Sequence, residues 1–306
     1  SHIGLSAFDA RTGNTDLHLN GTIDNLYGFV FKKEILKGNF NLSSNKLVVN
    51  DFMQPATASS SPATTAKATQ SSTTASAIKV PAFLDCTLSA KAGTVLYDNL
   101  TLSNVSGKLI IKDEKVALEN LKTDIFGGNI ALAGDVSTKE ATPTFDVNLN
   151  LSKLNIADAF TQITMLEKIA PIAKVVQGKV NTVIKVKGKL KSDLTPEINT
   201  ISGDLFASLI DSKVVSEASP LLSALDSQFT GLNLSNLNLK DLKAAVDFED
   251  GKVKIKPFTL KYKDVAIQVA GSHGFDQQIN YKLLFNVPPQ MLGKEAENLL
   301  TKLTPE

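Results

Sequence analysis

The sequence of 306 residues contains no tryptophan, and its aromatic residues make up only 6% of the chain. Proteins that bind single-stranded nucleic acid stack the bases on aromatic side chains, which are scarce here. The formal net charge is +1, so the chain has no general attraction to a phosphate backbone. We therefore expect no nucleic-acid partner.

Cysteine and histidine, which are common metal ligands, are also rare. Cys86 is the only cysteine, so no intrachain disulfide can form, and we expect it to be a small core residue. The histidines are His2, His18 and His273, and none has metal-ligand spacing to a cysteine or another histidine. We expect His18 on the polar face of a strand and His273 in a turn beside Gly274. The sequence therefore predicts no metal ion and no cofactor.

Catalytic motifs are missing as well. The sequence has no G-x-S-x-G element, and FGGN (126–129), which we interpret as a bend between strands, lacks the Lys-Ser/Thr pair of a phosphate-binding loop. The carboxylates are scattered over polar faces, where solvated charge is the usual interpretation. We expect that the protein is not an enzyme. A hydrolase whose site is assembled from distant residues is the catalytic alternative.

Long apolar runs are absent. No stretch of about 18 apolar residues predicts a transmembrane helix, and the sequence shows no signal peptide. A membrane anchor upstream of residue 1 remains an open alternative.

Residues 54–77 differ in composition from the rest of the chain. Ser, Thr and Ala fill 19 of these 24 positions, and Lys67 is the only charged residue. Because such a segment cannot bury a core, we expect a flexible insertion, with a glycosylated stalk as the alternative. It divides the chain into an N-terminal β segment (1–53) and a larger β domain (78–306).

Most of the remaining sequence has apolar residues at every second position. The alternation is clearest in TFDVNLNL (144–151), VIKVKGKL (183–190) and INYKLLFNV (279–287). A period of two with one polar face is typical of antiparallel sheets. We predict a mainly β protein with a few helices (α+β), whose elongated, curved antiparallel sheet forms a groove or half-barrel.

Three segments have helical spacing instead, near 155–177, 219–229 and 289–303. Pro171 should divide the first, and Gly178 should end it. Ser219 and Pro220 suit the N-cap and first residue of the second. We expect these helices to cap or plug the sheet, and simple packing on the sheet is the alternative.

One apolar pattern occurs three times, with steps of 2, 5, 2 and 3 residues. The copies are Phe40, Leu42, Leu47, Val49 and Phe52; Leu109, Ile111, Val116, Leu118 and Leu121; and Val246, Phe248, Val253, Ile255 and Phe258. The polar residues between their halves, SSNK, KDEK and EDGK, predict four-residue hairpin loops. A second unit places a glycine on the apolar face of a strand, at Gly21, Gly134, Gly188 and Gly271. A glycine there permits either a bulge or a close approach of the neighbouring backbone.

The segments 97–137, 143–160 and 248–288 resemble the C-terminal region of AsmA-like proteins. In 248–288 the similarity lies in a G-K-V-x-I-x-P-F core and a final D-Q-x-I-x-Y-x-L strand. AsmA-like proteins belong to the repeating β-groove, lipid-transfer-type proteins. The resemblance implies a periplasmic protein tethered to the inner membrane, with a role in outer-membrane assembly or phospholipid traffic. It implies no catalytic residues.

The pattern and the resemblance together favour a non-enzymatic envelope protein that binds or conducts phospholipid acyl chains in an apolar groove. A periplasmic scaffold with a sealed core, binding envelope proteins at its strand edges, is the alternative. The residues expected to line the groove are Phe145, Val147, Leu149, Ile184, Val186, Ile267, Val269, Tyr281, Leu283 and Phe285.

Overall fold

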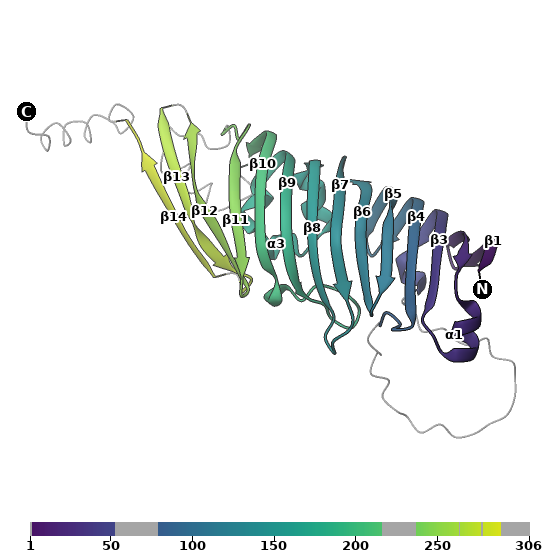
Figure 1. Cartoon of the computed structure of the whole chain (residues 1–306). Coiled ribbons are helices and arrows are strands. Elements are labelled where there is room, and N and C mark those ends of the chain that lie inside the picture. The colour runs from purple at the N-terminus through teal and green to yellow at the C-terminus, as the bar shows by residue number, and fades with distance from the viewer. Residues whose placement is uncertain (1, 53–78, 216–236, 263, 277, 289–306) are drawn as a thin grey trace, which may run out of the picture. The chain divides into compact units, whose positions relative to one another are not determined.

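The structure is a computed structural model that describes residues 2–52, 79–215, 237–262, 264–276 and 278–288. Its strands form one sheet in which each strand lies beside the next along the chain (Figure 1). They are β1 (Ile3–Thr12), β2 (Thr15–Ile23), β3 (Leu36–Val48), β4 (Leu84–Tyr97), β5 (Leu100–Lys112), β6 (Lys115–Ile125), β7 (Gly128–Ser137), β8 (Thr144–Asn155), β9 (Val176–Lys189), β10 (Ser202–Val214), β11 (Lys243–Glu249), β12 (Lys252–Tyr262), β13 (Val265–Gly274) and β14 (Ile279–Asn286). This confirms the prediction of a mainly β protein with a few helices.

The chain divides into two compact units. The N-terminal unit comprises Ser1–Ile125, Ile130–Asn148 and Lys187–Glu197, and the C-terminal unit comprises Phe126–Asn129, Leu149–Val186 and Ile198–Glu306. The predicted insertion 54–77 and the predicted helices 219–229 and 289–303 lie outside the described residues.

Side chains in the N-terminal unit form apolar rows across strands β2 to β6. Residues that pair across neighbouring strands present their side chains on the same face of the sheet. One row is Gly21, Phe40, Leu88, Leu109 and Leu118, and the next is Ile23, Gly38, Cys86, Ile111 and Val116. Cys86 is 7% exposed, as expected for a small core residue.

Strands β3 and β4 pair in parallel, whereas the sequence predicted antiparallel neighbours throughout. A parallel pair needs a connection that returns to the starting end of the first strand, which a tight turn cannot provide. Residues 49–83 make this connection. The segment that interrupts the repeat in the sequence therefore also connects two parallel strands, so that β4 starts at the same end of the sheet as β3.

Two of the three predicted hairpin loops are hairpins, but with two-residue turns. Lys112 pairs with Lys115, which leaves Asp113 and Glu114 in the turn, both at positive φ. Turns with two consecutive positive φ angles match the twist of the flanking strands. Between β11 and β12 the turn residues are Asp250 and Gly251, also at positive φ. Each predicted four-residue loop is therefore two residues too long, because its first and last residues pair with each other and belong to the strands.

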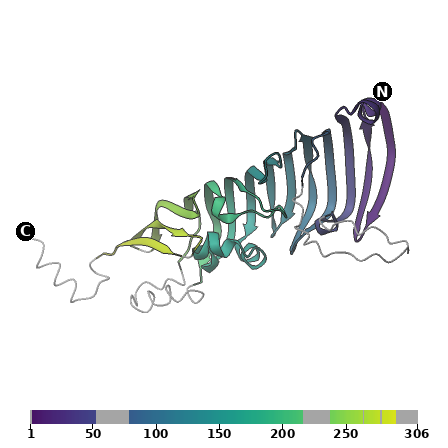
Figure 2. The ribbon, with the colours of Figure 1, turned by 90° about the horizontal axis from the view of Figure 1, so that it is seen from below.

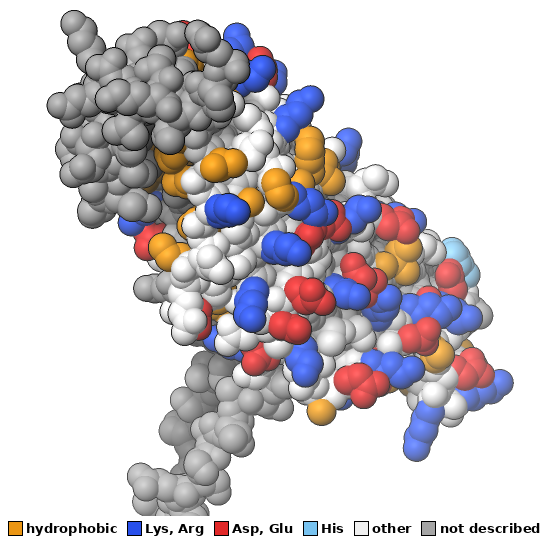
Figure 3. Space-filling view, turned by 90° about the vertical axis from the view of Figure 1, so that its left-hand side faces the viewer, with side chains coloured by type: hydrophobic (Ala, Val, Ile, Leu, Met, Phe, Trp, Pro, Cys, Tyr) orange, Lys and Arg blue, Asp and Glu red, His pale blue; other side chains and the backbone are white. Residues whose placement is uncertain are grey.

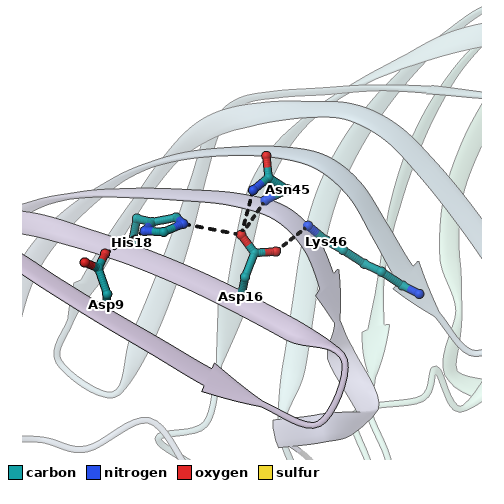
Figure 4. Close-up of polar contacts among 5 residues, drawn as sticks. All are labelled: Asp9, Asp16, His18, Asn45 and Lys46. Atoms are coloured by element: carbon teal, nitrogen blue, oxygen red, sulfur yellow. Dashed lines mark hydrogen bonds and ion pairs between the residues drawn. The ribbon is translucent and has the colours of Figure 1, made fainter.

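The third predicted loop, SSNK (43–46), is wrong because these residues lie inside β3. The carboxylate of Asp16 in β2 accepts hydrogen bonds from backbone N–H groups of this segment (Figure 4). Its Oδ2 accepts hydrogen bonds from the backbone N–H (2.9 Å) and Nδ2 (3.0 Å) of Asn45, and its Oδ1 accepts one from the backbone N–H of Lys46 at 2.8 Å. The backbone hydrogen bond from Asn45 is the main reason why the pKa of Asp16 lies below its usual value.

The glycines of the second repeat unit allow close backbone approach, as predicted. Gly134 and Gly271 have φ of 147° and 145°, a region that other residues rarely adopt. A Cβ added to either would overlap a backbone carbonyl oxygen of the next strand, that of Asp146 or Asn280. Neighbouring strands are therefore in contact through their backbones at these points.

The helix predicted over 155–177 is three short pieces, coloured teal against the sheet in Figure 2. They are α2 (Ile156–Gln162), α3 (Leu166–Ile169) and the 3-10 helix η2 (Pro171–Val175). Asn155 caps α2 by accepting a hydrogen bond from the backbone N–H of Asp158. Pro171 starts a new piece, as expected, but Gly178 does not end a helix. It lies within β9, where a Cβ would overlap Ser212.

The remaining helical pieces are in the N-terminal unit and, around Ile198, beside β10. They are α1 (Leu26–Lys32), η1 (Val49–Phe52) and η3 (Ile198–Thr200). In the part of the chain that the structure describes, every helix is too short or too polar to cross a membrane.

Candidate functional site

The apolar side chains of several strands form a sheet face that is only half-buried. In β9, Ile184 and Val186 are half-buried and alternate with the exposed Val183 and Lys185. The same alternation runs along β8. We call the side of the sheet that carries these half-buried residues the apolar face, and the opposite side the polar face. Residues beneath a complete second layer would be more fully covered.

In the C-terminal unit the apolar face continues in register from β10 to β14. One row across these strands is Leu205, Val246, Ile255, Gly271 and Tyr281. A neighbouring row is Gly203, Phe248, Val253, His273 and Ile279. The close contact of Gly203 with Val186 adds β9 to this surface.

The structure brings five of the ten predicted lining residues together on β13 and β14. Ile267 pairs with Phe285, and Val269 pairs with Leu283. Tyr281 follows on the same face of β14. Four of them are half-buried or exposed, but Ile267 is only 4% exposed and packs beside Val265, Leu260 and Phe285. Ile267 is therefore part of a closed cluster and is not accessible as groove lining.

The other five predicted residues lie on β8 and β9. Phe145 and Val147 belong to the N-terminal unit, where Val147 adjoins Gly134. Leu149, Ile184 and Val186 belong to the C-terminal unit. All five are half-buried. Strands β10, β11 and β12 separate β9 from the β13–β14 group, so the predicted set is two groups with further apolar residues between them.

Sequence reasoning missed the contribution of β10. Its half-buried residues Leu205, Ala207 and Leu209 lie on the apolar face. In the sequence, Leu205 is followed by Phe206 and Leu209 by Ile210, so the apolar residues come in adjacent pairs and hide the period of two. The three-fold repeat did mark β11 and β12, through Val246, Phe248, Val253, Ile255 and Phe258.

The segment from α2 to η2 covers part of the apolar face of the C-terminal unit. At one end, Val175 packs with Val214, Leu237 and Leu239. Near the middle, the carbonyl oxygen of Ile169 lies 2.8 Å from Nε2 of His273 on β13. These contacts show that the helical segment packs on the sheet, which agrees with the simpler of the two expectations for it.

His273 was predicted to lie in a turn, but it lies in β13 and is 3% exposed. Its Nε2 faces the carbonyl of Ile169, and its Nδ1 is 2.6 Å from the hydroxyl of Tyr281. In the neutral ring, Nε2–H donates to Ile169 and Nδ1 accepts from Tyr281. Burial lowers the pKa of His273, an effect that the hydrogen bond to Ile169 opposes, and burial raises the pKa of Tyr281.

Acidification from about pH 7 to about pH 5 is expected to destabilise the C-terminal unit through His273. Its folded pKa lies below its unfolded value, so the unfolded chain binds more protons in this range and stability falls as the pH falls. The measurement is the urea midpoint at both pH values. His273→Gln cannot be protonated and should show a smaller pH dependence. An equal dependence in both proteins would contradict this role.

Thr182 places an unpaired hydroxyl on the apolar face. It is 8% exposed, and its Oγ1 has no hydrogen-bond partner among the described residues. Thr182→Val keeps the shape and removes the buried polar atom, so we expect the free energy of unfolding to rise by about 1 kcal/mol. Thr182→Ser keeps the hydroxyl and loses a methyl group, so it should be less stable than the parent. Urea unfolding measures both, and a valine variant no more stable than the parent would refute the assignment.

The polar face carries ion pairs between neighbouring strands. Lys108 and Glu119 are 3.2 Å apart, and Lys112 and Asp85 are 3.4 Å apart, each pair directly across the ladder. Figure 3, seen from the left-hand side of Figure 1, shows basic and acidic side chains interspersed, with hydrophobic ones among them. Exposed pairs of this kind add about 0–1 kcal/mol each. The polar face is therefore the solvated side of the sheet.

Two open hollows in the C-terminal unit are lined by both polar and apolar groups. One, of about 310 Å³, includes Lys254, Ser272, Asn280 and Lys282. The other, of about 550 Å³, includes Gln177, Asp211, Lys213 and Asn238. Neither holds any of the ten predicted lining residues, although the first hollow includes Ile255 and Gly271 of the apolar face.

His18 lies on the polar face, as predicted. Its Nδ1 is 2.6 Å from Oδ1 of Asp9, and its Nε2 is 3.5 Å from Oδ2 of Asp16 (Figure 4). Asp16 already accepts three hydrogen bonds from β3, so its carboxylate has a structural role. Within the described ranges, no three or more His, Cys, Asp or Glu side chains are placed to hold a metal ion.

Comparison with known proteins finds no matching family model, curated protein or solved structure. Any functional assignment therefore depends on the residues and geometry of this chain, together with the resemblance of its strand patterns to AsmA-like proteins.

Proposed function

We propose that the protein is a non-enzymatic lipid-binding protein whose apolar face holds phospholipid acyl chains. The observation that carries this proposal is the half-buried state of the apolar residues along β8 and β9. These residues alternate with solvated ones, and within the described ranges the segment from α2 to η2 covers only part of the apolar face. Acyl chains would cover the part that this segment does not.

The energetics of such a site suit the residues present. Burial of each methylene contributes about 0.8 kcal/mol and has no directional requirement. A chain with about ten methylenes in contact gains about 8 kcal/mol before the costs of ordering the lipid. The site needs breadth of accessible apolar surface, which the half-buried residues of β8, β9 and β10 offer, and it needs no reactive group.

The cellular setting of the proposal comes from the AsmA resemblance. We propose that the protein acts in the periplasm, tethered to the inner membrane, and conducts phospholipid during outer-membrane biogenesis. The resembling segments include β5 to β8 and β12 to β14, whose repeated hairpins form part of the sheet.

The test is whether the purified chain carries lipid. We expect organic extraction followed by mass spectrometry to find phospholipid at about one molecule or more per chain, and a fluorescent fatty acid to bind saturably after delipidation. An unrelated β protein purified from the same host is the control for carry-over. Lipid at the control level together with unsaturable fatty-acid binding would refute the proposal.

A scaffold with a sealed core is the second candidate, and one observation favours it. Val265 and Ile267 are 1% and 4% exposed, so the apolar face is closed at that point. In this reading, protein partners pair with the edge strands β1 and β14. A lipid-free preparation that binds no fatty acid but captures envelope proteins through these edges would support it.

A further inference from the structure

Exposed hydrophobic residues gather at one end of the N-terminal unit. They are Tyr27 (58% exposed), Val30 (56%), Phe31 (71%), Ile35 (44%) and Phe83 (48%). We call this group the aromatic patch. The other large hydrophobic residues that the described chain exposes are distributed over β1, β9, β10 and β14. Single exposed hydrophobic residues are ordinary, whereas a contiguous group marks an interaction surface.

The parallel pairing of β3 and β4 brings the patch together. Leu36 and Leu84 begin these strands and pair with each other, so the segments that precede them enter the sheet side by side. The backbone N–H of Leu36 donates to the carbonyl of Phe83 at 2.7 Å. The ring of Phe29 in α1 lies 5.5 Å from the ring of Phe83. The patch is therefore held by the sheet and does not depend on the short helix alone.

The charges beside the patch are basic. Lys32 and Lys33 end α1, are exposed, and form no ion pair with any described residue. Two acidic residues also lie nearby. The Glu34 carboxylate lies against the backbone of α1, and Asp24 is 2.7 Å from His2. Lys32 and Lys33 thus place two cationic groups, without ion-pair partners among the described residues, beside the aromatic side chains.

We propose that the aromatic patch docks the N-terminal unit on the surface of an anionic lipid bilayer. Aromatic side chains prefer the level of the headgroups, and adjacent lysines gain from anionic phosphates there. The apolar part of a lysine side chain lies along the patch while its ammonium group stays in water. A protein partner or a second copy of the chain could also cover apolar surface, but the lysines favour an anionic bilayer. This inference does not rest on acyl-chain binding by the sheet.

A single introduced tryptophan can report docking, because the chain contains none. With vesicles of phosphatidylglycerol and phosphatidylethanolamine, Phe31→Trp should show blue-shifted emission and quenching by brominated lipids. Phe206→Trp places the reporter at another exposed phenylalanine, on β10, and should show neither change. Quenching at both positions or at neither would overturn the proposal.

Sedimentation with the same vesicles gives the affinity. We expect Tyr27→Ser combined with Phe31→Ser to weaken binding about tenfold or more, Phe206→Ser to leave it unchanged, and about 0.5 M salt or Lys32→Gln to weaken it severalfold. Both serine sites are exposed, and thermal melts check folding. Light scattering tests the alternative that the patch mediates self-association. If the parent does not bind vesicles but forms dimers, and the double variant is monomeric, the patch is a self-association surface and the bilayer proposal is wrong.

Discussion

Replacing Ile184 by glutamate is expected to weaken acyl-chain binding about tenfold or more, because a carboxylate facing a hydrocarbon chain loses its hydration. Ile184 is half-buried on the apolar face of β9, next to the row that begins with Leu205 on β10. The measurement is displacement of a fluorescent fatty acid, together with the amount of phospholipid that co-purifies.

The neighbouring residue supplies a matched control. Val183 is 46% exposed and points to the polar face, so Val183→Glu should bind lipid as the parent does. A second pair lies on the edge strand β14, where a new charge is better tolerated. Leu283 (39% exposed) is on the apolar face, and Leu284 (54%) is on the polar face. If Leu283→Glu and Leu284→Glu bind lipid equally well while both remain folded, the apolar face is not the lipid site.

The largest loss of stability is expected from Gly271→Ala. The φ of 145° is strained for alanine, which costs about 1–3 kcal/mol, and crowding adds about 1–3 kcal/mol. The new Cβ would overlap the carbonyl oxygen of Asn280, and would lie 2.7 Å from Cα of Tyr281. Because both contacts are with backbone, β13 and β14 would have to separate. Urea unfolding should show a marked drop in midpoint.

Gly4→Ala is the control for this substitution. Gly4 lies in β1, has no positive φ, and an added Cβ would meet no atom within 4 Å. Alanine there should leave stability unchanged or raise it slightly, since it restricts the unfolded chain. Equal behaviour of the two variants would show that close approach at Gly271 is not required by the fold.

Much of the sheet could be predicted because its two faces differ in burial. Strands such as β8 and β9 alternate strictly in the sequence, and the same alternation appears in their burial. The turn at 113–114 was correctly placed between two strands, although its length was wrong. What misled the prediction at SSNK was local polarity, because partners distant in sequence hold this segment in the sheet. It pairs with β4, and Asp16 accepts hydrogen bonds from the backbone N–H groups of Asn45 and Lys46.

The parts of the candidate site that were missed depend on contacts between distant residues. The sequence predicts that His273 is a turn residue beside Gly274. In the structure its ring forms hydrogen bonds with the carbonyl of Ile169 and the hydroxyl of Tyr281, and these bonds allow the ring to be buried. Ile267 follows the same period as Val269, yet its neighbours cover it and leave Val269 half-buried. Periodicity identifies the face on which a residue lies, and only the packing decides whether that face is reached by solvent.

The strand order has a consequence for how such a chain can change in length. Strands β1 and β14 each have one neighbour, so no closure condition fixes the number of strands between them. If a hairpin is added or removed within the β4 to β14 meander, the strands that follow move by two strand positions. Each of their side chains stays on the same face of the sheet. The number of strands can therefore change in steps of two with the length of the gene, because the first and last strands do not have to pair with each other.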